Sequence, residues 1–237
     1  MVFAGTLVLA PAQPDAGGKG AGRAGSFTVS QHGKAVGTAE FTVTPAARGY
    51  SSTSVVRVSM QGLEYSLSKT ETLLGDNRLR HAQLSAAVNG SAVNVIATPD
   101  ATQILINISA NGHSSTTSLA LHSGAVFVAD FDPGALDTLL ALGAASNNRD
   151  LWAIVPKGAG TVAAVVLATY ADEQGTLDGK PVTVHHLVAT IGGAVTDLFS
   201  GPENELLQAE LPQPGFALVR KGFVLTPSVK PGAPPEQ

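Results

Sequence analysis

Three aspartates stand close together in the stretch FVADFDPGALDTLLAL, residues 127–142. Asp130, Asp132 and Asp137 follow an apolar run and precede a leucine-rich one. Carboxylate oxygens are the ligands that Ca²⁺ prefers, so these residues are candidate metal ligands. They do not complete an EF-hand loop, because the glycine and the distal glutamate are misplaced. We otherwise expect no cofactor, and a bound Ca²⁺ is the one that the sequence leaves open.

A helix offers a competing explanation for the same aspartates. Asp132 fits the N-cap position and Pro133 the first helical position, and the leucines that follow have helical spacing. We therefore predict the main helix at about residues 133–146, ended by SNNRD. Capping then explains Asp132, and the helix dipole explains Asp137 only in part. Asp130 has no structural explanation from sequence.

His186 and Ser114 are the candidate catalytic side chains. In VTVHHLVAT, strand alternation sends His185 and His186 to opposite faces, so one undistorted strand cannot offer both to a metal. His186 shares its face with valines, which predicts a buried or cavity-lining imidazole. Ser114 lies in NGHSSTTS, which approaches a nucleophile elbow. A polar Asn-Gly hairpin is the favoured explanation, because Thr116 replaces the second glycine and β-prone residues follow.

Two glycine-rich stretches resemble nucleotide-binding loops only superficially. GAGRAG at residues 20–25 matches G-x-G-x-x-G, but a strand pattern follows it where a helix is needed. KGAG at residues 157–160 follows an apolar strand, yet the next residues are β-branched with a period of two. We interpret KGAG as a hairpin turn.

Short runs rich in valine, isoleucine and threonine alternate with turn signals along most of the chain. Strands joined by such short turns must pair antiparallel, because parallel crossovers need a dozen or more residues. The sequence predicts a mainly β fold: a single curved antiparallel sheet, a half-barrel or open barrel with meander connections, and one main helix. The strongest turn signals are Asn89-Gly90, Asn111-Gly112, Asp178-Gly179 and Gly192-Gly193.

Composition excludes several classes of function. The chain has 237 residues, of which 44% are hydrophobic, 14% are charged and 5% are aromatic, with a net charge of -4. Without clustered lysine and arginine or a stacking platform, it is not a nucleic-acid-binding protein. The absence of cysteine removes disulfides, thiolate metal sites and cysteine nucleophiles.

The first residues predict export. VFAGTLVLAPA has the length of a signal-peptide core and ends on a small-x-small cleavage pattern, although a buried N-terminal strand is the alternative. No other apolar stretch approaches the roughly 20 residues of a membrane span. We therefore expect a periplasmic or secreted protein that does not span the membrane. Its predicted parts are a signal-peptide remnant at 1–12, a flexible leader at 13–25, a single β-rich domain at 26–226 and a disordered Pro-rich tail at 227–237.

Three segments together resemble an uncharacterised family of exported bacterial β-proteins, which is distantly similar to the half-barrel of the LolA/LolB lipoprotein carriers. They are the opening hairpin FTVSQHGKAVGTAEFTVTPAARGYSSTSVV, the helix segment DFDPGALDTLLAL, and the closing DLFSGPENELLQAELPQPGFALVRKGF. The likeness spans about residues 25–225 and implies a half-barrel. It transfers no catalytic residues, and the low aromatic content departs from the carriers.

We predict a binding or carrier-type protein for an apolar or amphipathic small molecule or lipid. The first alternative is a hydrolase of an amphipathic ester or lactone, with Ca²⁺ at Asp130 and Asp132 and with His186 as general base. The second is a structural envelope protein. Oligomeric state stays open. The hydrolase requires Asp130, Asp132 and His186 to meet around one cavity, which is the observation that separates these functions.

Overall fold

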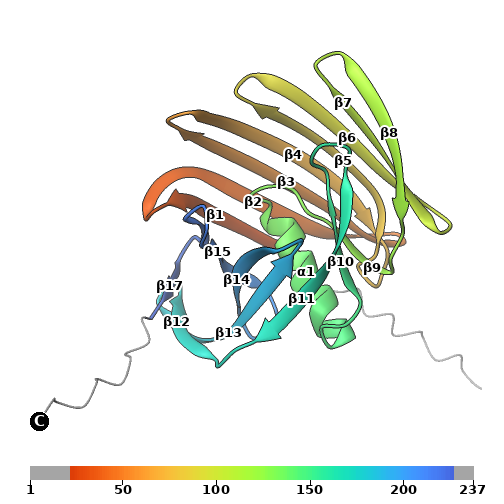
Figure 1. Cartoon of the computed structure of the whole chain (residues 1–237). Coiled ribbons are helices and arrows are strands. Elements are labelled where there is room, and N and C mark those ends of the chain that lie inside the picture. Colours follow the sequence, from red (N-terminus) through yellow and green to blue (C-terminus); the bar gives the residue numbers. More distant parts are fainter. Residues whose placement is uncertain (1–21, 227–237) are drawn as a thin grey trace, which may run out of the picture.

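A large curved sheet wraps around one helix in the computed structural model, which describes residues 22–226 (Figure 1). The predicted signal-peptide remnant and the Pro-rich tail lie outside the described residues. The first strand begins at Arg23, so the last three residues of the predicted leader belong to the sheet. These residues join the sheet because the first strand pairs with the next one, where Val43 lies opposite Arg23.

Eight strands form an antiparallel meander in the first half of the chain. They are β1 (Arg23–Gln31), β2 (Lys34–Ala46), β3 (Gly49–Met60), β4 (Leu63–Leu73), β5 (Leu79–Val88), β6 (Ser91–Asp100), β7 (Gln103–Ala110) and β8 (His113–Ala120).

The second half contains the helix and the remaining strands. In chain order these are β9 (Gly124–Phe127), α1 (Pro133–Ser146), β10 (Leu151–Val155), β11 (Thr161–Thr169), β12 (Glu173–Leu177), β13 (Lys180–Ile191), β14 (Ala194–Ser200), β15 (Leu206–Leu211), β16 (Phe216–Arg220) and β17 (Phe223–Leu225).

The two halves join into one sheet because β1 pairs with both β2 and β16. From this seam the sheet runs through β2 to β8 on one side, and through β16, β15, β14, β13, β11 and β10 to β9 on the other. Every pair is antiparallel except β9 with β10. β12 pairs with β13 and with β17. The predicted mainly β fold, with a curved and unclosed antiparallel sheet and one main helix, is confirmed.

The predicted hairpin turns have the backbone that asparagine and glycine favour. Asn89 and Gly90 adopt φ of 49° and 81°, and Asn111 and Gly112 adopt 51° and 76°. Two successive positive φ angles are the signature of type I′ turns, whose twist matches that of the strands they join. These turns set the register that places alternate side chains on the concave face.

The helix begins and ends where the sequence predicts. Asp132 is the N-cap, with extended backbone, and its Oδ1 accepts hydrogen bonds from the backbone N–H of Gly134 at 3.0 Å and of Ala135 at 3.3 Å. At the other end Asn147 takes the left-handed conformation, with φ of 52°, and closes the helix.

α1 lies between the broad wall of β1–β8 and the smaller wall of β10–β16 (Figure 1). Its leucines are buried on both sides, and Leu139 is 0% exposed. Each buried leucine stabilises this docking by about 1.5–3 kcal/mol. A second, smaller core of Val184, Phe199, Leu207 and Phe223 fills the space beneath β12 and β17. The described helix is too short to cross a membrane.

Candidate functional site

An apolar groove lies beside the beginning of α1. Two hollows of about 490 Å³ and 430 Å³ make up this groove. The two hollows are adjacent, because they share the lining residues Tyr65, Val88, Val128, Ala129, Asp130 and Lys157.

Aliphatic and aromatic side chains from both walls line the groove. In the larger hollow these include Phe131, Leu136, Ile191, Leu211, Phe216 and Leu218. In the smaller hollow they come from β5, β6 and β7 and include Leu84, Val93, Val95 and Ile108. Strand alternation explains this lining, since every second residue of these strands faces the concave side. α1 packs against β2 and β3 instead, which leaves this part of the concave face accessible.

The segment between β9 and α1 forms one side of the groove, and its backbone is strained at Phe131. Phe131 has φ of 57°, a conformation that costs energy for a bulky residue and that often marks functional segments. Its ring packs edge-on against Tyr65, with ring centres 5.7 Å apart, and against Phe216, at 4.8 Å. The hydroxyl of Tyr65 donates to the carbonyl of Asp130 at 3.3 Å, and burial raises the pKa of Tyr65. These contacts hold the segment in place at the side of the groove.

Asp130 belongs to an ion pair that both hollows share. Its Oδ1 lies 2.9 Å from Nζ of Lys157, and the two side chains are 48% and 69% exposed. The predicted turn at residues 157–160 carries this lysine to the groove. The sequence predicted no partner for Asp130, and the structure shows that its partner is Lys157.

Asp132 lies in a fully buried polar cluster with Lys69, Glu71, Ser52 and Ser54. Nζ of Lys69 contacts Oδ2 of Asp132, lies 2.9 Å from Oε2 of Glu71, and donates to the carbonyl of Phe127 at 3.3 Å. The side chains of Lys69 and Asp132 are both 0% exposed. This cluster ties β4 to the first turn of α1 and to the end of β9.

The carboxylates of this cluster outnumber its ammonium. Burial would lower the pKa of Lys69, but Asp132 and Glu71 together raise it above its ordinary value. Burial also raises the pKa of Glu71, more than the attraction of Lys69 lowers it. Glu71 therefore binds a proton more readily than an exposed glutamate does.

The raised pKa of Glu71 predicts how stability depends on pH. The folded protein binds this proton more tightly than the unfolded chain, whose glutamate has a pKa of 4.5. Its stabilising contribution is complete below about pH 4.5 and is lost as pH rises through the folded pKa. In Glu71→Gln, this part of the slope disappears, while the buried Asp137 still titrates in both proteins. Urea unfolding at several pH values measures both slopes, and identical slopes would contradict the prediction.

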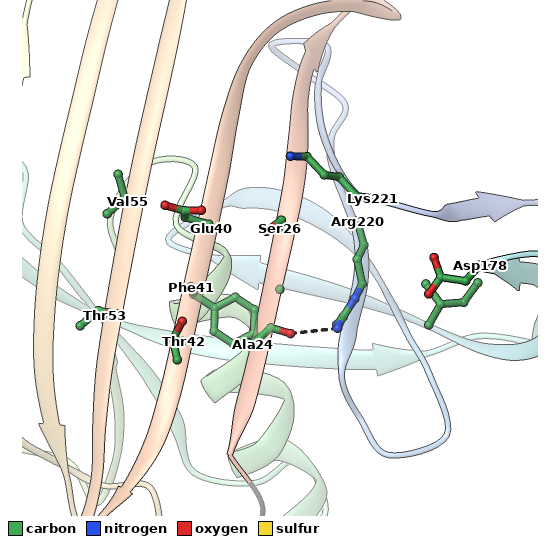
Figure 2. A pocket seen from close by; sticks show the side chains of 12 residues that line it. Ala24, Ser26, Glu40, Phe41, Thr42, Thr53, Val55, Asp178, Arg220 and Lys221 are labelled. Atoms are coloured by element: carbon green, nitrogen blue, oxygen red, sulfur yellow. Dashed lines mark hydrogen bonds between the residues drawn. The ribbon is translucent and has the colours of Figure 1, made fainter.

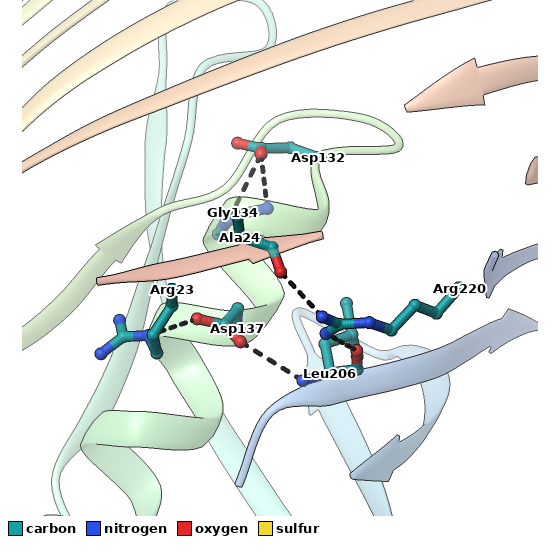
Figure 3. Close-up of polar contacts among 8 residues, drawn as sticks. Arg23, Ala24, Asp132, Gly134, Asp137, Leu206 and Arg220 are labelled. Atoms are coloured by element: carbon teal, nitrogen blue, oxygen red, sulfur yellow. Dashed lines mark hydrogen bonds and ion pairs between the residues drawn. The ribbon is translucent and has the colours of Figure 1, made fainter. Parts of the chain in front are cut away.

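Asp137 fastens the helix to two strands (Figure 3). Nε of Arg23 donates to its Oδ2 at 2.7 Å, and the backbone N–H of Leu206 donates to its Oδ1 at 3.3 Å. Burial raises the pKa of Asp137 despite the attraction of Arg23. Arg220 extends the network by donating to the carbonyls of Leu206 and Ala24. The role of Asp137 is therefore a tertiary contact and not a helix-dipole effect.

The three predicted metal ligands thus face three different cationic partners: Lys157, Lys69 and Arg23. Within residues 22–226, no three histidine, aspartate or glutamate side chains form a group that could hold a metal ion. Asp130 and Asp132 both border the groove, while Asp137 does not.

His186 lies outside the groove lining, next to the second core. Its Nε2 is 2.9 Å from Oδ1 of Asp197 and its Nδ1 is 3.4 Å from Oε1 of Glu173. The ring stacks on Phe199 and Tyr170, with centres 4.6 Å and 5.2 Å away. The sequence predicted a buried or cavity-lining imidazole; the side chain is 18% exposed and lines neither hollow, so the structure does not place it with Asp130 and Asp132 around the groove.

Ser114 is exposed on β8, in the hairpin that the sequence favours over a nucleophile elbow. Its Oγ lies 2.8 Å from Oγ of Ser109, across the hairpin. His185 is partly exposed, with Nδ1 2.9 Å from Oδ1 of Asp172. Ser114 and His186 therefore have separate hydrogen-bond partners.

Sequence reasoning missed Lys69 and Glu71. A signal was available, because the inward positions of β4 read Leu67, Lys69, Glu71, Leu73. Two charged residues in the apolar phase of a strand are unusual unless they are paired. They form a cluster with Asp132, which is far from them in the sequence, so β4 alone does not reveal the cluster.

A polar hollow of about 430 Å³ lies on the other side of β1 to β3 (Figure 2). Outward-facing residues such as Glu40 and Thr53 line it, together with Arg220 and Lys221. Arg220 is already engaged, since its Nη2 donates to the carbonyl of Ala24 at 2.8 Å. The apolar groove, whose lining converges from both walls, is the stronger candidate site.

No family model matches the sequence. The same comparison with curated proteins and with solved structures finds no match. The similarity to the LolA/LolB half-barrel therefore stays a prediction, and the candidate site rests on the geometry of this chain.

Proposed function

We propose that this is an exported binding or carrier-type protein that shelters an apolar or amphipathic ligand in its groove. The observation that carries the proposal is the adjacency of the two apolar hollows, which share six lining residues. Ligand sites are typically concave and mostly apolar, with few polar groups. The groove has this composition, and Asp130 and Lys157 are the charged groups that both hollows share.

The groove favours a ligand with an extended hydrocarbon part. Two adjacent hollows suit a chain better than a compact ring system. The exposed ion pair of Asp130 and Lys157 would meet a polar head group, while the aliphatic lining buries the tail. Burial of each methylene contributes about 0.8 kcal/mol, so a chain of about ten or more methylenes is needed for micromolar affinity.

The geometry gives less support to the alternatives. A calcium-assisted hydrolase needs Asp130, Asp132 and His186 around one substrate, yet the two aspartates face lysines and His186 lies by the second core. The envelope protein remains the outcome to accept if the groove takes no ligand and the chain assembles at high concentration.

Titration with a fluorescent long-chain fatty acid tests the proposed function. We expect saturable binding with a fluorescence increase, and competition by unlabelled fatty acid or phospholipid. A short-chain analogue with the same head group serves as the matched control and should bind at least about tenfold more weakly, since it loses several buried methylenes. Failure to bind any of these chains would overturn the proposal.

Lys157 is exposed and lines both hollows, which predicts that affinity depends on the charge of the ligand's head group. Lys157→Glu places two carboxylates side by side where Nζ and Oδ1 now lie 2.9 Å apart. An exposed charge contact contributes about 0–1 kcal/mol, so affinity for an anionic amphipath should fall up to about fivefold. Affinity for an uncharged amphipath should stay within about twofold. The difference should shrink as salt increases, and equal losses for both ligands would contradict it.

A further inference from the structure

We propose that Lys69 and Asp132 condense into an intramolecular amide (isopeptide) bond that links β4 covalently to the first residue before α1. This is a self-modification of the fold and does not depend on the groove or its ligand. The chain has no cysteine, so a link between these side chains would act where other proteins use a disulfide.

The reacting groups already touch. Nζ of Lys69 contacts Oδ2 of Asp132, and both side chains are 0% exposed. Among the described residues, no other hydrogen-bond donor satisfies Oδ2, so the amine of Lys69 is the group that faces it. The other oxygen, Oδ1, is held by the N–H groups of Gly134 and Ala135. The carboxyl group is thereby oriented with one oxygen fixed and the other turned toward the amine.

Glu71 completes the geometry. Its Oε2 lies 2.9 Å from Nζ of Lys69, and its side chain is 2% exposed. Lys69 and Glu71 occupy alternate positions of β4, so they share the inward face. Burial raises the pKa of Glu71, which favours its protonated form. A carboxyl group at this position can take a proton from the attacking nitrogen and return one to the departing oxygen.

The reaction balances without any further reagent. The lysine ammonium and the aspartate carboxylate together contain the atoms of one amide and one water molecule. One proton first passes from Nζ to Oδ2, which leaves a neutral amine beside a carboxylic acid. The bond between Nζ and Cγ of Asp132 then forms, Nζ loses a second proton, and the bond between Cγ and Oδ2 breaks. Oδ2 leaves with both protons as water, one of them relayed by Glu71. Oδ1 remains as the amide oxygen and continues to cap α1.

Two physical factors favour this condensation. Groups held in contact react as if at very high concentration, with effective molarities of about 10⁵–10⁸ M. The product also replaces two buried charges, whose removal from water is costly, with a neutral amide. Water released from a fully buried site passes to the solvent. Three buried ionisable groups would then become one buried acid beside an amide.

The test is mass spectrometry of the purified full-length protein. We expect its denatured mass to fall below the mass of its own processed sequence by one water molecule. Digestion with trypsin should release residues 58–78 and 81–149 as one joined peptide, uncut after Lys69. Loss of water from Asp132 by succinimide formation is excluded, because the next residue is Pro133, which has no N–H.

Matched variants separate the bond from the fold. Glu71→Gln keeps the size of the side chain and the Lys69–Asp132 contact, so it should fold, by circular dichroism, and retain the full mass. Asp132→Ala removes the carbon that is attacked and should also retain the full mass. A folded wild-type protein with the full mass overturns the proposal. So does a loss of water that maps to other peptides, and the same loss in Glu71→Gln would remove Glu71 from the reaction.

Discussion

Lys69→Met should lower the free energy of unfolding by at least about 3 kcal/mol, measured by urea denaturation at pH 7. The substitution removes the ammonium that contacts the carboxyl groups of Asp132 and Glu71, whose side chains are 0% and 2% exposed. Breaking a buried ion pair in this way costs about 3–5 kcal/mol, because charge is left in the interior without a partner, and protein that has formed the amide loses the covalent link as well. Methionine keeps the length and apolar stem of lysine, so little of the loss comes from a cavity.

Two comparisons identify the cause of that loss. The triple variant Lys69→Met, Glu71→Gln, Asp132→Asn carries no buried charge and keeps an N-cap side chain, so it should be more stable than the single variant by about 3–5 kcal/mol. Neither protein can form the proposed amide from Lys69, so this difference is electrostatic. Lys157→Met breaks the exposed pair with Asp130 and should cost at most about 1 kcal/mol. A Lys69→Met loss below about 1 kcal/mol would contradict the assignment.

The sequence predicted what is encoded locally. Asp132 and Pro133 mark the helix start because capping involves atoms only two or three residues apart. Asparagine and glycine pairs predicted the hairpins, because their positive φ angles are a property of those residues. Short turns then required antiparallel neighbours, and the curved open sheet followed. The sequence did not predict the parallel pairing of β9 with β10, because the helix separates these two strands in the chain.

The partners of the aspartates were beyond local reasoning. Asp130, Asp132 and Asp137 each meet a cation from a distant segment: Lys157, Lys69 and Arg23. Which cation reaches which carboxylate depends on strand register and on where the helix docks. The groove has the same origin, because its two walls meet only when β1 joins β2 to β16. Residue types identified the chemically active stretch, and tertiary pairing decided its chemistry.

The segment before α1 connects the groove with the buried polar cluster. The segment from Phe127 to Asp132 ends at the buried polar cluster on one side and lines the groove on the other. Phe131, strained at φ of 57°, lies directly before the anchored Asp132. The contacts of Asp132 fix the residue next to Phe131, so we expect them to help preform this side of the groove. Preformed sites bind more tightly because less ordering is needed on binding.

Ala129→Trp should abolish most of the binding of a long-chain fatty acid. Ala129 lines both hollows, so an indole at this position fills the point where they join. A ligand that loses contact for two or three methylenes loses about 1.6–2.4 kcal/mol, which weakens affinity by about 15- to 60-fold. Fluorescence titration of the wild-type protein and the variant measures this ratio.

A tryptophan of the same size elsewhere provides the control. Ala92 lies exposed on β6, next to the groove-lining Val93 but on the opposite face of the strand. Ala92→Trp should therefore bind the fatty acid within about twofold of the wild-type protein, since it touches no part of the groove. Thermal unfolding of both variants shows whether each remains folded. Equal affinities of a folded Ala129→Trp and the wild-type protein would place the ligand elsewhere, because no extended chain could occupy both hollows past an indole at their junction.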